Sequence, residues 1–562
     1  MHKIRKQSQL VKLALLMFMP VSLFSGATVF SGQEARPAVK SFDGTVAMRD
    51  GVKLATTIYL PEGQGPWHVI ITRTPYNKAG YGQRAARYTA AGYAFVAQDC
   101  RGRFKSEGSY EPYQTDMEDG YDTIEWIAAQ PWCNGKVGIS GRSAMGIAAN
   151  LAAAADPPHL VCAYVVTASE SLFDESYFIG GIFREHFRGN FMRLQGVEDQ
   201  IPAMKARVLM DEQWKRTDFI HHRDKVRIPM FQVGGWFDMF AKGTINTFVY
   251  LQNQGRKGAR GNQKLWMGPW GHSALNGDLA FPGERGLDDG FADEMRWFDA
   301  WLKGINNGIK EEPAVTYYHM ASARKGALSA RNELRTASNW PPASRATNYY
   351  LAAEGGLNLK PPVMGNSTTT YKHDPANPVP TVGGANYNNN RQYPITVGPV
   401  DQRSINGGND YLRFQTAPLA EDVTIQGQVL FKLWAATDAP DTDFMVKLVD
   451  VYPDGYEALI LDSAIRARYR KGREARDVEM MKPNRAEQMM IDLWSTSLTF
   501  EKGHRIAVHI SSSNYPRFEV NANTGEAAGK STLAPRIATN RILHDRAHQT
   551  AIVLPVTSGS RN

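Results

Sequence analysis

Three polar residues, far apart in the chain, have the types and the order of a catalytic Ser–Asp–His set. Ser143 lies in GRSAMG (141–146), Asp238 in GGWFDMF and His272 in MGPWGHS. A serine hydroxyl is a weak nucleophile until a histidine takes its proton, and an acidic residue must orient that histidine. Such a set would attack an ester or amide carbonyl, form an acyl-enzyme and release it with water. This chemistry needs no metal or organic cofactor.

Each of these residues also has an ordinary structural interpretation. The common nucleophile pattern is G-x-S-x-G, and Met145 stands where its second glycine belongs. Ser143 could therefore lie in an ordinary strand–helix turn. Asp238 could cap the helix that follows it, and His272 could be one loop histidine among 13. Their order along the chain, and their positions just after apolar strands, favour the catalytic interpretation.

The elements that must position these residues alternate between strands and helices. Apolar or β-rich runs predict strands at 51–60, 68–72, 93–97, 136–139, 229–235 and 265–272. Helical spacing predicts helices over 116–130 and 147–155. This alternation predicts an α/β fold whose mainly parallel sheet has helices on both faces. Ligands bind such sheets beyond the carboxyl ends of the strands, where all three polar residues are expected.

The serine is expected on a sharp turn between a strand and a helix. Gly141 and Gly146 would supply the close backbone approach that a cramped turn requires. Such a turn lifts the hydroxyl above the sheet. The following helix points its N-terminus at the site, where it helps to hold negative charge.

The chain resembles the family that contains cocaine esterase, glutaryl acylase, α-amino-acid ester hydrolase and X-prolyl dipeptidyl aminopeptidase. The stretches that carry the resemblance span nearly the whole chain after its first 40 residues. They are MRDGVKLATTIYLP (48–61), TRTPYNK (72–78), QDCRGRFKSEG (98–108), PWCNGKVGISGRS (131–143), GGWFDMF (234–240), MGPWGHS (267–273) and ISSSNYPRFEVNANTG (510–525). The resemblance implies an α/β-hydrolase core with a helical cap insertion, followed by a C-terminal β-sandwich of jelly-roll type.

The resemblance also assigns the oxyanion hole. The family pattern is G-x-S-Y-x-G, which accounts for the late Gly146, but Ala144 stands where relatives usually have tyrosine. One donor is the backbone N–H of Ala144, which any side chain except proline preserves. The second donor is the hydroxyl of Tyr76, which in an ordinary interpretation is a half-buried aromatic residue after a strand. Losing one such donor typically costs about 10²–10³ in rate.

The domain organisation follows from changes in pattern along the chain. We expect the first part of the core at 40–170, an aromatic-rich cap at 171–225, the second part of the core at 226–345 and the jelly roll at 346–562. From about Asn348, short alternating runs separated by turn residues replace helical spacing. Residues 374–410, rich in Pro, Asn and Gly, predict a long loop.

The first 27 residues have the basic start, apolar run and small-residue end of a secretory signal peptide. They hold four positive residues and no acid, so their removal lowers the formal net charge from +8 to +4. We therefore expect export to the periplasm or the medium, no membrane association after cleavage and no nucleic-acid partner. A homo-oligomer is compatible with the sequence. Cys100 and Cys133 could pair in an exported chain, or with Cys162 they could be three buried small residues.

The sequence indicates the substrate class less clearly than it indicates the catalytic residues. Family members that cleave α-amino-acid esters hold the substrate ammonium with two carboxylates, at positions where this chain has Phe240 and Ala241. A small-molecule ester or amide without that ammonium is therefore favoured. Asp174 and Glu175 of the cap leave a proline-specific dipeptidase or an α-amino ester hydrolase as alternatives. A catalytically silent protein that binds ligands through its jelly roll is an alternative of another class.

Overall fold

The computed structural model describes residues 40–557, apart from 273, 276, 278, 284–289, 388–393, 406–409, 528 and 531. The expected signal peptide at 1–27 lies outside the described residues. No helix of the described part is both long and apolar enough to cross a membrane.

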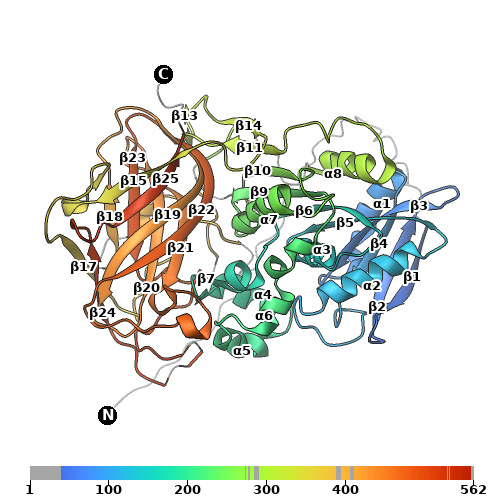
Figure 1. Ribbon diagram of the computed structural model, residues 1–562, viewed down its shortest axis with the longest axis horizontal. Helices are drawn as coiled ribbons and strands as arrows, with labels where there is room; N and C mark the ends of the chain where they lie inside the picture. The colour runs from blue at the N-terminus through green and yellow to red at the C-terminus, as the bar shows by residue number, and fades with distance from the viewer. Residues whose placement is uncertain are drawn as a thin grey trace, which may run out of the picture. The chain divides into compact units, whose positions relative to one another are not determined.

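A ten-stranded mixed sheet carries the predicted site (Figure 1). Its strands lie in the order β1-β2-β4-β3-β5-β6-β9-β10-β11-β14. Neighbours from β4 to β11 in that order are parallel, whereas β1, β2 and β14 join antiparallel. The strands span Lys40–Ala47 (β1), Lys53–Leu60 (β2), Trp67–Thr74 (β3), Ala94–Asp99 (β4), Cys133–Arg142 (β5), Leu160–Val166 (β6), Met230–Phe237 (β9), Lys264–Gly271 (β10), Val315–His319 (β11) and Glu333–Ala337 (β14). The predicted mainly parallel α/β fold is confirmed.

Helices cover both faces of this sheet. Along β3, Val69 and Ile71 pack into one buried cluster with α2 (Asp116–Ala128) and α3 (Ala144–Ala154). Ile70, between them, packs into another cluster with α1 (Gly82–Ala90) and α8 (Phe291–Phe298). Successive side chains of a strand point to opposite faces, so an unbroken apolar strand must be covered on both sides. The helix α7 (Ala241–Gln254) follows β9 and starts three residues after Asp238.

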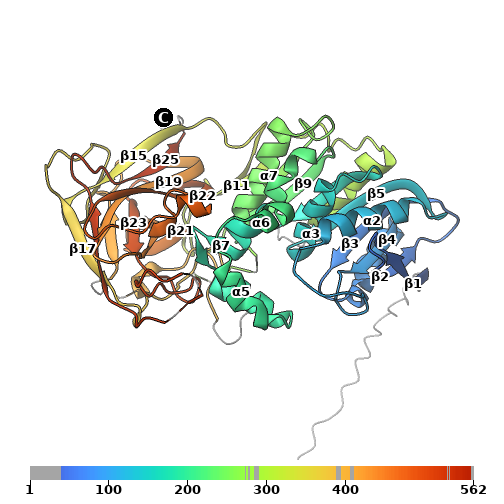
Figure 2. The same cartoon turned by 60° about the horizontal axis from the view of Figure 1, so that its bottom comes forward.

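The segment between β6 and β9 forms short helices rather than long ones (Figures 1 and 2). It contains α4 (Asn190–Leu194), α5 (Ile201–Ala206), α6 (Glu212–Thr217), π-helical turns at Leu172–Tyr177 and Glu185–Gly189, and 3₁₀ turns at Glu198–Gln200, Phe219–His221 and Arg223–Lys225. It also contains a hairpin, β7 (Phe178–Ile179) and β8 (Ile182–Phe183), where we predicted helices. Gly180 and Gly181 both have positive φ at its turn, so the sequence FIGGIF carried a hairpin signal.

Two antiparallel sheets form the C-terminal part. The larger sheet has the order β16-β15-β25-β19-β24-β17, with β22 paired to β19, and the smaller has the order β18-β23-β20-β21. Their strands are β15 (Arg345–Leu351), β16 (Leu357–Asn358), β17 (Thr368–His373), β18 (Leu412–Gln415), β19 (Val423–Thr437), β20 (Asp443–Val451), β21 (Glu457–Arg466), β22 (Glu487–Phe500), β23 (Arg505–Ser511), β24 (Ala538–Leu543) and β25 (Ala551–Val556).

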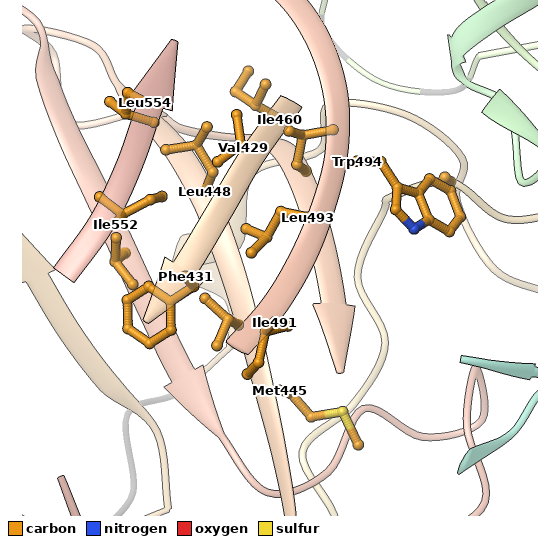
Figure 3. Packing of buried hydrophobic residues seen from close by; sticks show 14 of the residues in the cluster. Val429, Phe431, Met445, Leu448, Ile460, Ile491, Leu493, Trp494, Ile552 and Leu554 are labelled. Atoms are coloured by element: carbon orange, nitrogen blue, oxygen red, sulfur yellow. The ribbon is translucent and has the colours of Figure 1, made fainter. Parts of the chain in front are cut away.

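The core of this part lies between the two sheets. Figure 3 shows Val429, Phe431, Leu493 and Ile552 of the larger sheet near Leu448 of the smaller one, and all are buried. Side chains from two inner faces therefore fill one apolar layer, as in a β-sandwich. The predicted sandwich is confirmed. Its jelly-roll connectivity and the four domain boundaries remain predictions.

The three cysteines are free and buried in the structure. Cys100 and Cys133 therefore form no disulfide, and the second interpretation, three small buried residues, describes them. Burial raises the pKa of all three thiols, which keeps them protonated and unreactive.

Candidate active site

Ser143 lies on a strained turn between β5 and α3. Its φ is 59° and its ψ is −123°, a conformation that is unfavourable for a residue with a side chain. Glycine is required on either side of the serine because a Cβ atom at these positions would lie too close to its neighbours. One on Gly141 would overlap the Met145 carbonyl, and one on Gly146 would lie 3.0 Å from the Cβ of Ala168. Both predicted close approaches are confirmed.

His272 follows the last residue of β10 and contacts the serine. Its Nε2 lies 2.8 Å from Oγ of Ser143, and its Nδ1 lies 2.8 Å from Oδ2 of Asp238. Because a carboxylate only accepts hydrogen bonds, Nδ1 donates to Asp238, which leaves Nε2 to accept from the serine hydroxyl. The structure thus brings together three residues separated by up to 129 positions in the sequence.

Asp238 is fully buried directly after β9 and makes two contacts with its carboxylate. Oδ2 accepts from His272, and Oδ1 accepts the backbone N–H of Phe240 at 2.6 Å. The second contact fixes the turn that leads into α7. Asp238 is therefore the partner of the histidine and not the helix cap, because the N-cap of α7 is Phe240 and has no side-chain cap.

Tyr76 and Ala144 line the same cavity as Ser143. Tyr76 is 44% exposed, and its hydroxyl forms no hydrogen bond to any described residue. Desolvation by the surrounding protein raises the pKa of Tyr76 well above its ordinary value, so the hydroxyl keeps its proton and can donate it. Ala144 is the first residue of α3, and the first N–H groups of a helix have no partner within the helix. Both groups are therefore available to a substrate oxygen.

The cavity has a volume of about 360 Å³ and is mainly aromatic and apolar. The described residues that line it are Tyr76, Tyr113, Arg142, Ser143, Ala144, Met145, Ile147, Phe187, Asn190, Phe191, Leu194, Gln195, Phe240, His272 and Tyr387. None of these is an acid. Arg142 is the basic side chain among them besides His272, and its Nη2 donates to the carbonyl of His272 at 3.3 Å.

Tyr387 is a site residue that no sequence pattern indicated. It comes from the long loop at 374–410, and its ring meets the imidazole of His272 edge-on, with centroids 5.1 Å apart. Phe240 meets the same imidazole edge-on at 5.6 Å. Both rings therefore pack against the imidazole. No local signal in the loop could mark Tyr387, because only tertiary contacts bring it to the cavity.

The carboxylates considered as ammonium anchors do not line the cavity. Phe240 and Ala241 occupy the second and third positions after Asp238 and are buried. Glu175 accepts the N–H of Gly243 at 2.7 Å, and Asp174 pairs with Arg473. Both cap acids thus have structural partners elsewhere.

A second Ser–His–Asp arrangement is present outside the cavity. Nε2 of His504 lies 3.2 Å from Oγ of Ser322, and its Nδ1 lies 2.8 Å from Oδ1 of Asp450. Burial opposes protonation of His504, but the hydrogen bond and charge of Asp450 raise its pKa above the ordinary value. Ser322 has no positive φ and does not precede a helix. This set has the contacts of the first one without its turn or helix, and its residues do not line the cavity beside Ser143.

The fold and the contacts of Ser143 define the class of the protein, which is that of the α/β-hydrolases that use a serine. A family model described as X-Pro dipeptidyl-peptidase (S15 family) matches residues 50–209 and 192–274. A model of the X-Pro dipeptidyl-peptidase C-terminal non-catalytic domain matches 307–553. Cocaine esterase of Rhodococcus sp. (strain MB1 Bresler) is 30% identical over 91% of this chain and 97% of its own length. The chain belongs to this family, the serine hydrolases of the CocE/NonD type.

Other relatives agree with this family. A putative serine esterase of Mycobacterium bovis is 24% identical over 95% of this chain and 99% of its own length. The solved structure of an α-amino acid ester hydrolase superposes with a TM-score of 0.79 at 26% identity, covering 94% of this chain and 98% of that one. An aminopeptidase from a marine sediment archaeon, Thaumarchaeota archaeon, reaches the same TM-score at 23% identity, covering 96% and 99%. At that identity the likeness shows the shared fold.

Proposed function

We propose that the protein is an exported serine esterase or acylase that hydrolyses a small carboxylic ester or amide through an acyl-enzyme. This proposal rests on the position of the His272 imidazole at the wall of the cavity. Its Nε2 lies 2.8 Å from Oγ of Ser143, and its Nδ1 lies 2.8 Å from Oδ2 of Asp238. Export rests on the signal-peptide pattern of residues 1–27.

The mechanism follows from these contacts. Nε2 of His272 takes the proton of Ser143 as Oγ attacks the carbonyl carbon, and Asp238 stabilises the imidazolium that forms. The Tyr76 hydroxyl and the Ala144 N–H donate to the oxygen on which negative charge develops. The imidazolium then gives its proton to the leaving group. Water, activated by the same histidine, releases the acyl group.

The cavity favours an apolar or aromatic acyl group without an α-ammonium. Burying an ammonium without a carboxylate is costly, and no described lining residue is an acid. The same observation weighs against an X-prolyl dipeptidase, since its substrates carry a free N-terminal ammonium. The small Ala144 side chain leaves more room beside the serine than the tyrosine usual in relatives.

The test is turnover of a p-nitrophenyl ester series of increasing acyl length. We expect a burst of p-nitrophenol equal to the enzyme concentration, or steady turnover, from the mature wild type and none from Ser143→Ala. Ser322→Ala is the matched control, because it removes the hydroxyl of the second Ser–His–Asp set and should retain full activity. Equal activity in wild type and Ser143→Ala would refute the nucleophile assignment. Inactivity of the wild type on esters, amides and aminoacyl substrates would favour the silent binding protein.

A further inference from the structure

Arg188, in the segment between β6 and β9, is a buried cation with no ion-pair partner among the described residues. Its side chain is 0% exposed. Nε donates to the carbonyl of Ser176 at 3.4 Å, neither Nη atom makes a hydrogen bond of good geometry to a described residue, and the Tyr113 phenol interacts with the guanidinium. Burying a guanidinium without a carboxylate is costly, and an unsatisfied buried group of this kind requires an explanation.

Four aromatic rings surround the guanidinium. Their centroids lie 4.3 Å (Tyr177), 4.8 Å (Phe191), 5.0 Å (Phe187) and 5.8 Å (Tyr113) from its central carbon. Contacts with ring faces offset part of the desolvation cost and leave the positive charge in place. A carboxylate paired with Arg188 would cancel its positive charge. The aromatic rings stabilise the guanidinium without cancelling its charge.

Arg188 does not line the cavity itself but contacts residues that do. Tyr113, Phe187 and Phe191 line the cavity, and their rings also contact Arg188. Arg188 itself has no exposed surface with which to touch a ligand. Any effect on the reaction must therefore act through the electric field or through a neighbouring residue.

The charge of Arg188 acts on the phenols of Tyr76, Tyr113 and Tyr177, and of these Tyr76 is the one assigned to the oxyanion hole. Desolvation dominates and raises the pKa of the Tyr76 phenol, the Tyr387 hydroxyl adds to that effect, and the charge of Arg188 opposes both. A positive charge that favours negative charge at the Tyr76 oxygen also strengthens that hydroxyl as a hydrogen-bond donor. The guanidinium itself is fully buried among aromatic rings, and a buried charge is screened less than an exposed one.

We propose that Arg188 is a positioning residue for the hydrolysis proposed above, and that its unpaired charge strengthens the oxyanion hole through the Tyr76 hydroxyl. A neutral ester carbonyl gains little from a distant cation, whereas the oxyanion of the tetrahedral intermediate gains more. The interaction is therefore stronger in the transition state than in the ground state and accelerates the chemical step.

The test compares Arg188→Met, which removes the charge and keeps most of the bulk, with Arg188→Lys, which keeps the charge. Arg207→Met is the matched control, since Arg207 also stacks on a ring of this segment, that of Trp214 at 4.8 Å, but pairs with Asp211 and does not line the cavity. Thermal unfolding of each variant monitors folding.

Two measurements are made on each protein, kcat and KM for a neutral p-nitrophenyl ester and adduct formation with 1,1,1-trifluoro-4-phenylbutan-2-one. Oγ of Ser143 adds to the ketone carbon, the carbonyl electron pair moves to oxygen, and the serine proton passes to His272. The ¹⁹F resonance of the resulting hemiketal reports ionisation of its oxygen as the pH is varied.

We expect Arg188→Met to lower kcat about 10- to 100-fold with KM within about twofold, and to raise the pKa of the hemiketal oxygen by about 1 to 2. Arg188→Lys should recover most of both effects, and Arg207→Met should match the wild type. An unchanged hemiketal pKa in Arg188→Met, or equal losses in the Met and Lys variants, would overturn the role of Arg188. A wild type that forms no adduct and hydrolyses no ester would overturn the proposed function, and this inference with it.

Discussion

The carboxylate of Asp238 holds the imidazole of His272 with one oxygen, at 2.8 Å, while its other oxygen accepts the backbone N–H of Phe240 at 2.6 Å. One side chain thus fixes both the base and the turn that precedes α7. Because the two contacts use different oxygens, a substitution that replaces one carboxylate oxygen can remove one contact and keep the other.

Asp238→Asn should separate them. The asparagine oxygen can still accept from Phe240, so stability should change little. Its amide cannot stabilise an imidazolium, and the histidine adopts the wrong tautomer, so kcat should fall by about 10⁴. The matched control is Asp211→Asn, which keeps the cap on the N–H of Trp214 and has no histidine partner. A loss of less than tenfold in Asp238→Asn, measured with a p-nitrophenyl ester, would argue against Asp238 as the acidic member.

Gly141→Ala should prevent the serine turn from forming. The new Cβ would overlap the backbone carbonyl of Met145, and backbone cannot rotate away as a side chain can. We expect loss of activity of at least about 100-fold, with destabilisation in the upper range for single substitutions, about 3–5 kcal/mol. Gly82→Ala, where the new Cβ meets no atom within 4 Å, is the control and should be close to neutral. Urea unfolding and ester turnover measure both effects, and normal activity in Gly141→Ala would contradict the tight turn.

Tyr76→Phe removes a hydroxyl and leaves the ring. We expect kcat to fall about 10²–10³ with a small change in KM, since the lost donor serves the oxyanion more than the bound ester. The raised pKa of Tyr76 also predicts that the wild type loses no activity from phenol ionisation up to about pH 10, its ordinary value. Tyr121→Phe, on α2, is the control, and an unaltered kcat in Tyr76→Phe would remove the hydroxyl from the oxyanion hole.

The enzyme should prefer an ester without an α-ammonium over the matching ester that carries one. Phenylacetyl and phenylglycyl p-nitrophenyl esters differ by the α-ammonium, which the cavity offers no described acid to bind. We expect kcat/KM to favour the phenylacetyl ester by at least about tenfold, or 1.4 kcal/mol. Measuring both esters at a pH where the amine is charged, and again where it is neutral, gives an internal control. A preference for the charged ester would restore the α-amino ester hydrolase alternative.

His319 should make the protein sensitive to acid. It lies on β11, and its two ring nitrogens bond the hydroxyls of Ser497 and Thr499 on β22. Burial, with the charges of Arg335 and Arg331, lowers the pKa of His319 to about 3. The unfolded chain takes up a proton near pH 6.5, so the stability from neutral His319 is complete above pH 6.5 and is lost as the pH falls toward 3.

The slope from this residue is at most about 1.4 kcal/mol per pH unit within that window. His319→Gln keeps a donor and an acceptor for the two hydroxyls and cannot titrate, so its unfolding free energy should fall less steeply between pH 6.5 and pH 4.5. Urea unfolding at both pH values measures the difference. His159→Gln, an exposed histidine beside Glu125, is the control, and identical slopes in wild type and His319→Gln would show that His319 does not titrate on unfolding.

The sequence alone predicted the class of fold and the three polar residues that meet at the proposed site. Strand and helix periods are local, and the order Ser143, Asp238, His272 after three apolar strands follows from the way parallel strands present their carboxyl ends at one edge. The FIGGIF hairpin was equally local, although we predicted only helices for that segment. For these features, the signal lies in neighbouring residues.

Tertiary structure alone decided what surrounds the three residues. Tyr387 contacts His272 from a position 115 residues away, and the described residues packed around the Arg188 guanidinium are four aromatic rings rather than a carboxylate. The free state of the cysteines and the exclusion of Asp174 and Glu175 from the cavity were decided in the same way. Burial, distance and the absence of a counter-charge depend on which side chains meet after folding, and spacing along the chain carries no record of that.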